Sequence, residues 1–248
     1  MKKIFFVMAV FIFPTIVWAE EKEENDGKAE FSVNADLVSS YVWRGIYLGG
    51  SSIQPDMSFS LGGFSVGAWG SVDITGFGMY KEVDLYASYS FGNFTAGLFN
   101  YWDCSEGDFN YFDFSENTAH KLEVNLLYSF DPFPLSLGWN TIVAGNDHFN
   151  ENGKAKRAFS TYAEASYAFS VKEVYLDVAL GVSPWKSSTL YTNYYWRNGE
   201  KDGFQVVNLS LTASRNIKIT DRYSLGIFGQ LAFNPACEDT FFVFGIKF

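Results

Sequence analysis

Residues 82–102 read EVDLYASYSFGNFTAGLFNYW, two runs of alternating residues joined by a tight turn at Gly92-Asn93. In the first run every second residue is apolar, as at Val83 and Leu85, and most of the residues between are charged or polar. Alternation with a period of two is typical of a β-strand with one apolar and one polar face. The stretch therefore predicts a β-hairpin.

The same alternation recurs along the chain. Twelve segments show it, at about 29–46, 52–61, 64–74, 81–91, 94–103, 119–130, 135–145, 157–169, 173–184, 203–215, 222–234 and 239–248. No segment after residue 28 predicts a helix. We therefore expect an all-β fold.

The connections between these segments alternate in length. The short ones are 62–63, 92–93, 131–134, 170–172 and 216–221, and the generally longer ones are 47–51, 75–80, 104–118, 146–156, 185–202 and 235–238. Short periplasmic turns and longer extracellular loops are typical of bacterial outer-membrane barrels. The pattern predicts a transmembrane, antiparallel, up-and-down β-barrel of about 12 strands, spanning residues 29–248.

A soluble β-sandwich also alternates, with its apolar face forming an inner core. The barrel is favoured because the segments have roughly the length of ~9–11 residues that a tilted strand needs to cross a bilayer. Aromatic residues also gather near both ends of the segments, as in the two aromatic belts of membrane barrels. Those beside the short turns are Phe91, Phe94, Tyr128, Phe130, Tyr167, Phe169 and Tyr223, and those toward the other ends are Trp43, Trp102 and Trp139.

Both ends of the chain carry export features. Lys2 and Lys3 precede an uncharged apolar stretch that closes on Val17-Trp18-Ala19, so we expect residues 1–19 to be a cleaved signal peptide. Residues 20–28 would then form an acidic periplasmic segment. The last strand ends on alternating apolar residues that are similar to the signal read by the barrel assembly machinery: Phe242, Phe244, Ile246 and Phe248.

Net charge and motif content exclude several function classes. The formal net charge is −10, whereas nucleic-acid binding needs a basic footprint. No phosphate-cradling loop or CxxC motif is present, and we expect no cofactor, no metal site and no enzymatic activity. A lipid-modifying enzyme remains the competing class, and it would have to use His120 or His148. Cys104 and Cys237 are expected to be free thiols, with a bridge across the mouth as the alternative.

If the apolar face of each strand meets lipid, the other face lines the lumen. The charged residues expected there are Asp36, Arg44, Asp56, Glu82, Asp84, Lys121, Glu123, Glu164, Asp177 and Lys247. The aromatic residues expected there are Trp69, Tyr86, Phe99, Tyr162 and Tyr175. Many other inward positions are small, and twelve strands lie between barrels filled by side chains and barrels with water channels. A narrow pore or an occluded solute pocket is compatible with this lining.

Arg44 stands out because it interrupts the aromatic stretch YVWRGIYLGG, residues 41–50. It shares the parity of Asp36, so we expect it to point into the barrel near the outer mouth. Asp56 on the returning strand is its expected partner, unless Arg44 leaves a free positive charge at the mouth. Tyr41 and Trp43 have the opposite parity and are expected to face the outer membrane interface.

The stretch SSYVWRG, residues 39–45, followed by Pro55 and the strand at 64–71, resembles the N-terminal motif of the TorF-like porin family. Trp43 replaces the phenylalanine of that family's motif. The resemblance covers roughly residues 35–75, about a sixth of the chain. It implies an outer-membrane channel, and it carries no solute-binding residues over to this sequence.

The sequence thus predicts a channel in the outer membrane of a Gram-negative bacterium, for passive diffusion of small hydrophilic solutes with a mild cation preference. Its partners would be outer-membrane lipid, the barrel assembly machinery and those solutes, and not nucleic acid. The alternative is a closed-lumen barrel that recognises carbohydrate or a protein through aromatic outer loops, such as 108–117 and 191–203. A structural role is favoured for those loops, which would extend the strands above the membrane or fold in to narrow the mouth.

Overall fold

The computed structural model describes residues 28–76, 80–105, 110–115, 118–151, 154–188, 191 and 203–248. The expected signal peptide and residues 20–27 of the acidic segment lie outside the described residues. None of the described residues form a helix long and apolar enough to cross a membrane.

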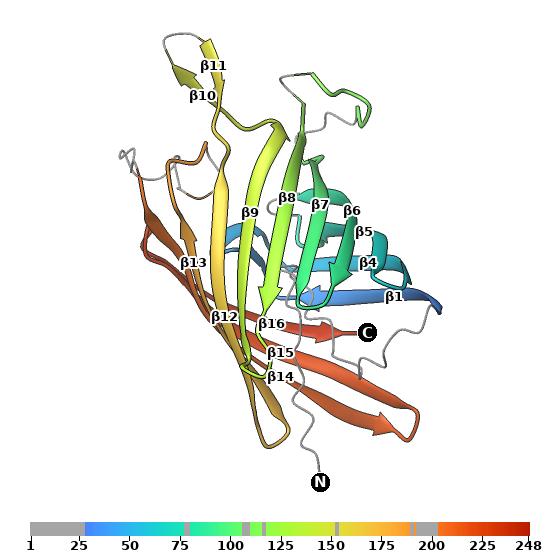
Figure 1. Ribbon diagram of the computed structural model, residues 1–248. Helices are drawn as coiled ribbons and strands as arrows, with labels where there is room; N and C mark the ends of the chain where they lie inside the picture. The colour runs from blue at the N-terminus through green and yellow to red at the C-terminus, as the bar shows by residue number, and fades with distance from the viewer. Residues whose placement is uncertain are drawn as a thin grey trace.

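One closed antiparallel barrel contains most of the described chain (Figure 1). Its strands, in chain order, are β1 (Ala29–Val38), β4 (Ser52–Leu61), β5 (Phe64–Asp73), β6 (Lys81–Phe91), β7 (Phe94–Asp103), β8 (His120–Ser129), β9 (Leu135–Gly145), β12 (Thr161–Val171), β13 (Val174–Ser183), β14 (Gln205–Thr220), β15 (Tyr223–Asn234) and β16 (Asp239–Lys247). Each pairs with the next along this series, and β16 returns to β1. The prediction of a twelve-stranded all-β barrel is confirmed.

Two small hairpins lie outside the barrel ladder. β2 (Tyr41–Trp43) pairs with β3 (Ile46–Gly49), and β10 (His148–Glu151) pairs with β11 (Lys154–Arg157). The first predicted segment, 29–46, is therefore wrong as a single strand. β1 ends at Val38, and a bend at Ser39-Ser40 directs the following residues away from the barrel wall.

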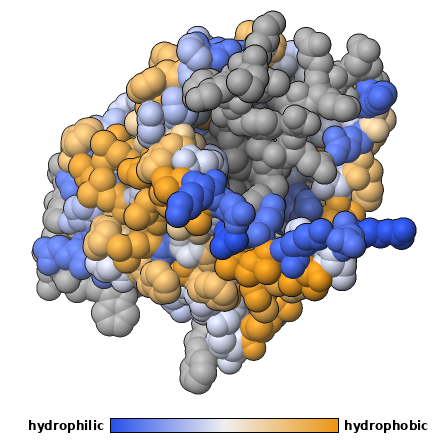
Figure 2. All heavy atoms as spheres, turned by 90° about the horizontal axis from the view of Figure 1, so that it is seen from below, coloured by the Kyte–Doolittle hydropathy of each residue, from blue (hydrophilic) through white to orange (hydrophobic). Residues whose placement is uncertain are grey.

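The barrel is apolar outside and polar inside, the reverse of a soluble protein. On β1, Phe31 and Val33 are 67% and 66% exposed, whereas inward-facing Asp36 is 3% exposed. Figure 2, seen from the short-turn end, shows apolar residues gathered in broad patches on the outer surface. This polarity follows from the period-two pattern, because successive side chains on a strand point to opposite faces.

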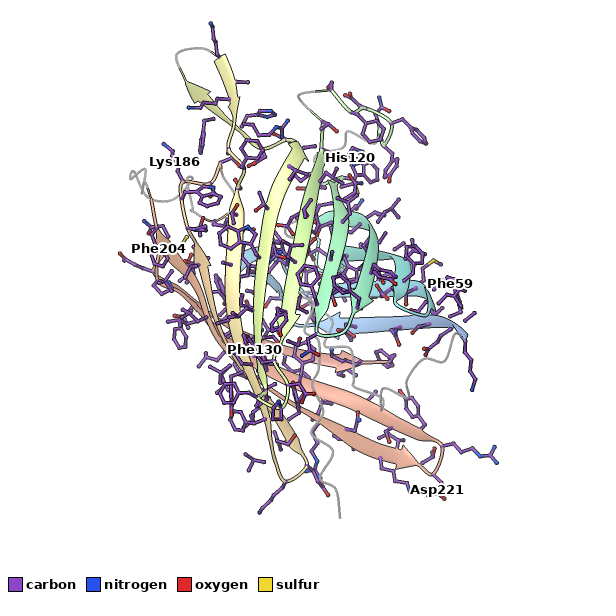
Figure 3. The ribbon with its side chains drawn as sticks, viewed as in Figure 1. Phe59, His120, Phe130, Lys186, Phe204 and Asp221 are labelled. Atoms are coloured by element: carbon purple, nitrogen blue, oxygen red, sulfur yellow. The ribbon has the colours of Figure 1, made fainter. Side chains whose placement is uncertain are left out.

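The loop end and the short-turn end are distinct in the structure. In Figure 3, His120 and Lys186 lie toward the loop end, and Phe130 and Asp221 lie toward the short-turn end. Asp221 marks the tip of the β14–β15 hairpin, which extends beyond the neighbouring strands (Figure 1). β1 begins and β16 ends at the short-turn end.

Closure between β1 and β16 is the shortest interface of the barrel, with three paired residues from Asp36↔Lys247 to Val38↔Gly245. Lys247 Nζ lies 3.7 Å from Asp36 Oδ2 across this seam. Gly245 faces the Phe228 ring of β15, and a Cβ at Gly245 would lie 2.1 Å from Phe228 Cε1. Glycine is required here because the Phe228 ring occupies the space that a side chain would fill.

We predict that Gly245→Ala lowers the free energy of unfolding by about 1–3 kcal/mol, since the added methyl must displace a packed ring beside the closing seam. The matched control is Gly229→Ala on β15, where the nearest atom would lie at an ordinary 3.8 Å. Denaturant titration of the refolded barrel, followed by tryptophan fluorescence, measures both variants. Equal stabilities of the two variants would contradict the packing argument.

Candidate functional site: a hairpin inside the barrel

The loop between β1 and β4 folds into the barrel instead of extending outward. Its hairpin, β2–β3, buries Tyr41 and Trp43, which are 3% and 8% exposed. The expectation that these two rings face the outer membrane interface is wrong. After the bend at Ser39-Ser40 the chain leaves the sheet, so strand parity no longer determines where its side chains point.

The tip of the hairpin is Arg44-Gly45, with φ angles of 51° and 77°. Positive φ at both central residues is the geometry of the two-residue turns that suit tight β-hairpins. A non-glycine residue in this region is strained by roughly 1–2 kcal/mol. Arg44 is therefore held in this conformation by what surrounds it.

Arg44 makes a bidentate ion pair with Glu123 of β8. Its Nη1 donates to Glu123 Oε1 at 2.7 Å, and its Nη2 donates to Glu123 Oε2 at 2.9 Å. The two side chains are 1% and 0% exposed. Two parallel charge-assisted hydrogen bonds in a low-dielectric interior are among the stronger polar contacts in proteins. Arg44 does point into the barrel, but its expected pairing with Asp56 is wrong, because the hairpin carries it away from β4.

Aromatic groups complete the surroundings of the guanidinium. Arg44 Cζ lies 4.3 Å from the centroid of the Trp43 ring and 4.7 Å from that of Tyr162. Arg44 Nη1 also donates to the Tyr191 hydroxyl at 2.6 Å. Burial raises the pKa of Tyr191 well above its ordinary value, so this phenol stays neutral and can accept that bond. Cation–π contacts stabilise a desolvated guanidinium in addition to its ion pair.

Glu123 is satisfied on both oxygens. Besides Arg44, Glu123 Oε2 accepts from the Tyr101 hydroxyl at 2.8 Å and from Asn125 Nδ2 at 2.7 Å. A buried ion pair offsets its desolvation only when such additional hydrogen bonds are present. Tyr101, Asn125 and Glu123 come from β7 and β8, so this side of the wall is built to receive the arginine.

The hairpin also contacts the rest of the wall. Tyr41 donates to Glu82 Oε2 of β6 at 2.9 Å, and its ring lies 5.5 Å from that of Trp69. The Gly45 carbonyl accepts from Asn234 Nδ2 of β15 at 3.0 Å. A Cβ at Gly45 would lie 2.1 Å from the Val207 carbonyl oxygen of β14. The hairpin therefore spans the lumen from β6 to β14 and fills its loop-end half.

The exposure of inward-facing residues along the strands shows which part of the lumen the hairpin fills. On β4 the inward residues Ser52 and Gln54, near the loop end, are fully buried, whereas Asp56 and the serines that follow it are partly exposed. β5 and β6 show the same change toward the short turns. On these strands solvent reaches the short-turn half of the lumen and is excluded from the loop-end half by the hairpin.

The charged residues expected in the lumen all lie on inward-facing positions of their strands or, for Arg44, on the hairpin. They are Asp36, Arg44, Asp56, Glu82, Asp84, Lys121, Glu123, Glu164, Asp177 and Lys247. The structure groups several of them around the hairpin, as with Arg44, Glu82 and Glu123. Asp56 instead accepts a hydrogen bond from the Tyr86 hydroxyl at 3.0 Å.

The expected lumen aromatics are also inward, and three are nearly fully buried: Trp69, Phe99 and Tyr162. Tyr86 and Tyr175 are partly exposed toward the short-turn half. Sequence reasoning missed Tyr41, Trp43, Tyr101 and Tyr191. Tyr101 has the inward parity of Phe99 and could have been found, whereas nothing in the sequence places Tyr191 of an outer loop inside the barrel.

The remaining candidate residues lie at the loop end of the barrel. His120 has outward parity on β8 and is covered by the loop after β7, with its Nε2 donating to the Tyr111 carbonyl at 2.6 Å. Hydrogen bonds from Ser115 lower the pKa of Asp113 in the same loop. Cys104 and Cys237 are buried and form no disulfide. No cluster of His, Cys, Asp and Glu among the described residues is arranged to hold a metal ion.

Residues 22–209 match the family model described as "Bacterial protein of unknown function (Gcw_chp)". The chain belongs to this family. No curated protein matches the chain. A solved structure described as "Unveiling the Mechanism Behind the in-meso Crystallization of Membrane Proteins" aligns over 88% of this chain and 83% of its own, with 11% identity and a TM-score of 0.45. That likeness is too low to bear on fold or function.

We predict that Gly45→Ala displaces the hairpin tip, because its methyl would collide with the backbone of β14. Gly76→Ala is the matched control, since Gly76 has a similar φ of 74° but nothing within 4 Å of an added Cβ. Both variants share the cost of a left-handed alanine, on the order of 1 kcal/mol. Hydrogen exchange of residues 41–49 should rise only in Gly45→Ala, and equal protection in both variants would contradict the docking described above.

Proposed function

We propose that this protein is an outer-membrane channel for small hydrophilic solutes, closed in the described conformation by its own first outer loop. The single observation that carries the proposal is a polar lumen whose obstruction is a hairpin separate from the wall. β1 pairs with β4 from Ala29↔Leu61 to Val38↔Ser52 without using any hairpin residue. The hairpin can therefore leave the lumen without breaking the barrel.

Membrane placement is supported by the surface of the barrel. Backbone groups in hydrocarbon must all be paired, which a closed barrel achieves. Exposed aromatic residues lie near both ends, including Phe91 beside a short turn and the Trp139–Trp185 ring pair beside an outer loop. The expected signal peptide and the outward-facing Phe242, Phe244 and Phe248 of the last strand support export and barrel assembly. The resemblance to TorF-like porins supports the channel assignment.

The charge of the lining supports a mild cation preference. Seven of the ten inward charged residues are acidic, and the cation Arg44 is neutralised by Glu123. A pore lined by one sign of charge concentrates counter-ions. The proposal includes no catalytic activity and no cofactor, and the partners remain membrane lipid, the assembly machinery and small solutes.

A closed-lumen barrel that acts through its outer loops is the second candidate. The observation in its favour is the packed cluster of Tyr41, Trp43, Trp69, Tyr162 and Tyr191, which are all under 10% exposed. A lumen kept closed by this packing would not conduct. The two candidates differ in whether removal of the hairpin opens a conducting path.

Planar-bilayer recording of a variant with residues 41–49 replaced by a short glycine-serine linker tests the proposal. We expect the intact protein to be mostly silent and the variant to show frequent, cation-preferring openings, because the obstruction is gone. The control variant shortens the β10–β11 hairpin, which lies outside the lumen, and should behave as the intact protein does. A silent linker variant that is folded would contradict the channel and favour the closed-lumen barrel.

A further inference from the structure

The residues that hold the Arg44 guanidinium lie mostly on the barrel wall. Tyr101 lies on β7, Glu123 and Asn125 lie on β8, and Tyr162 lies on β12. These four residues are called the wall site below. The ladders that pair β7 with β8 and β9 with β12 include no hairpin residue. The barrel itself therefore fixes the positions of the residues that form the wall site.

Hydrogen bonds within the wall orient the Glu123 carboxylate. It accepts from the Tyr101 hydroxyl at 2.8 Å and from Asn125 Nδ2 at 2.7 Å. Asn125 Nδ2 also donates to Asn140 Oδ1 at 2.6 Å, and Asn140 Nδ2 donates to the backbone carbonyl of Tyr162 at 3.2 Å. None of these bonds involves the hairpin. A polar group held in this way by a second layer of hydrogen bonds is preorganised for its ligand.

The geometry of the wall site fits a guanidinium group, because one already occupies it. Both oxygens of Glu123 accept from Arg44, at 2.7 and 2.9 Å, and the Tyr162 ring centroid lies 4.7 Å from Arg44 Cζ. Two parallel hydrogen bonds to one carboxylate, beside an aromatic ring, match a planar fork of N–H donors. An ammonium group is a point charge and does not reproduce this arrangement.

Arg44 is nevertheless an imperfect occupant. Its φ of 51° lies in the left-handed region, which is strained for a residue with a side chain. Among the buried atoms of the described residues, Arg44 Nε and Asn125 Oδ1 have no hydrogen-bond partner. The wall site thus retains an acceptor that Arg44 does not use. A free guanidinium carries no turn strain and is able to rotate toward that acceptor.

Stability alone does not explain why a charged residue is placed at the hairpin tip. A buried ion pair is often no more stabilising than apolar side chains of similar volume. The neighbouring Trp43, Trp69 and Tyr191 are all buried, so an apolar tip would also have had packing partners. The charged contact has a property that apolar packing lacks, since a second molecule with the same group competes for it.

We propose that Tyr101, Glu123, Asn125 and Tyr162 form a binding site for a small solute that carries a guanidinium group, which Arg44 occupies as an internal ligand while the hairpin is docked. This inference rests on the proposed channel, because it names the class of solute and because access in the intact protein requires the hairpin to move. The acidic lining of the lumen favours such a cation. Hairpin docking and solute binding exclude one another.

Isothermal titration calorimetry with methylguanidinium chloride tests the site, using the full refolded chain with Arg44→Ala in an uncharged detergent. The truncation removes the resident guanidinium, and cavities made by truncation bind small molecules of matching chemistry. We expect saturable binding to this variant and at least about tenfold weaker binding to the unmodified protein, in which Arg44 competes. Methylammonium and methylurea, which lack the fork or the charge, should also bind at least about tenfold more weakly.

Two further variants show whether the binding is at the wall site. Adding Glu123→Gln to Arg44→Ala should weaken methylguanidinium binding at least about tenfold, because the carboxylate is lost. Arg215→Ala is the matched control, since Arg215 also pairs with a glutamate, Glu173, but the two side chains are 52% and 75% exposed. It should bind methylguanidinium no better than the unmodified protein does.

If Arg44→Ala fails to refold, the variant with residues 41–49 replaced by a glycine-serine linker takes its place, because it vacates the same wall site. Absence of methylguanidinium binding to the variant that folds would overturn the site. Binding that is unchanged by Glu123→Gln, or equal binding of methylurea, would overturn it as well.

The results for the wall site and for the channel are distinguishable. Methylguanidinium binding by a linker variant that stays silent in planar bilayers would support the site and contradict the channel. Conductance by the linker variant together with no methylguanidinium binding would contradict the site alone.

Discussion

The guanidinium of Arg44 is buried in the middle of a barrel, and the bidentate contact with Glu123 is what makes that burial tolerable. An unpaired charge in such a position is strongly destabilising, on the order of 3–5 kcal/mol when one partner of a buried pair is removed. The pair therefore constrains the tip of the β2–β3 hairpin to one place on β8. The packing of Trp43, Tyr162 and Tyr191 around the guanidinium depends on this placement.

The hairpin divides the lumen into two halves with different physical character. In the loop-end half, aromatic rings and satisfied polar groups are packed together, as with Tyr101, Glu123 and Asn125. In the short-turn half, small polar residues of β4, β5 and β6 are partly exposed to solvent. One half of the lumen is thus closed by the hairpin, and the other is open to solvent along these three strands.

Much of this fold could be predicted from the sequence, because the alternation of apolar and polar residues is a local property of each barrel strand. The hairpins that turn at Gly92-Asn93 and Gly62-Gly63, for example, follow directly from the turn residues and from the alternation of apolar and polar residues on either side. The hairpin could not be predicted, since residues 41–46 continue the alternation of β1 and only the bend at Ser39-Ser40 separates them. The Arg44–Glu123 pair joins residues 79 apart in sequence, and no local pattern specifies such a contact. The position of Tyr191 could not be predicted either, because this residue reaches the lumen from a loop.

A double-mutant cycle on Arg44→Met and Glu123→Leu, measured as the free energy of unfolding in lipid vesicles, tests the central claim most directly. Each single variant should lose about 3–5 kcal/mol, because the remaining charge is buried without its partner. The double variant should lose clearly less than the sum of the two single losses, since neither charge remains. Small and additive effects of the two substitutions would contradict the account, because they would show that the hairpin does not depend on this pair.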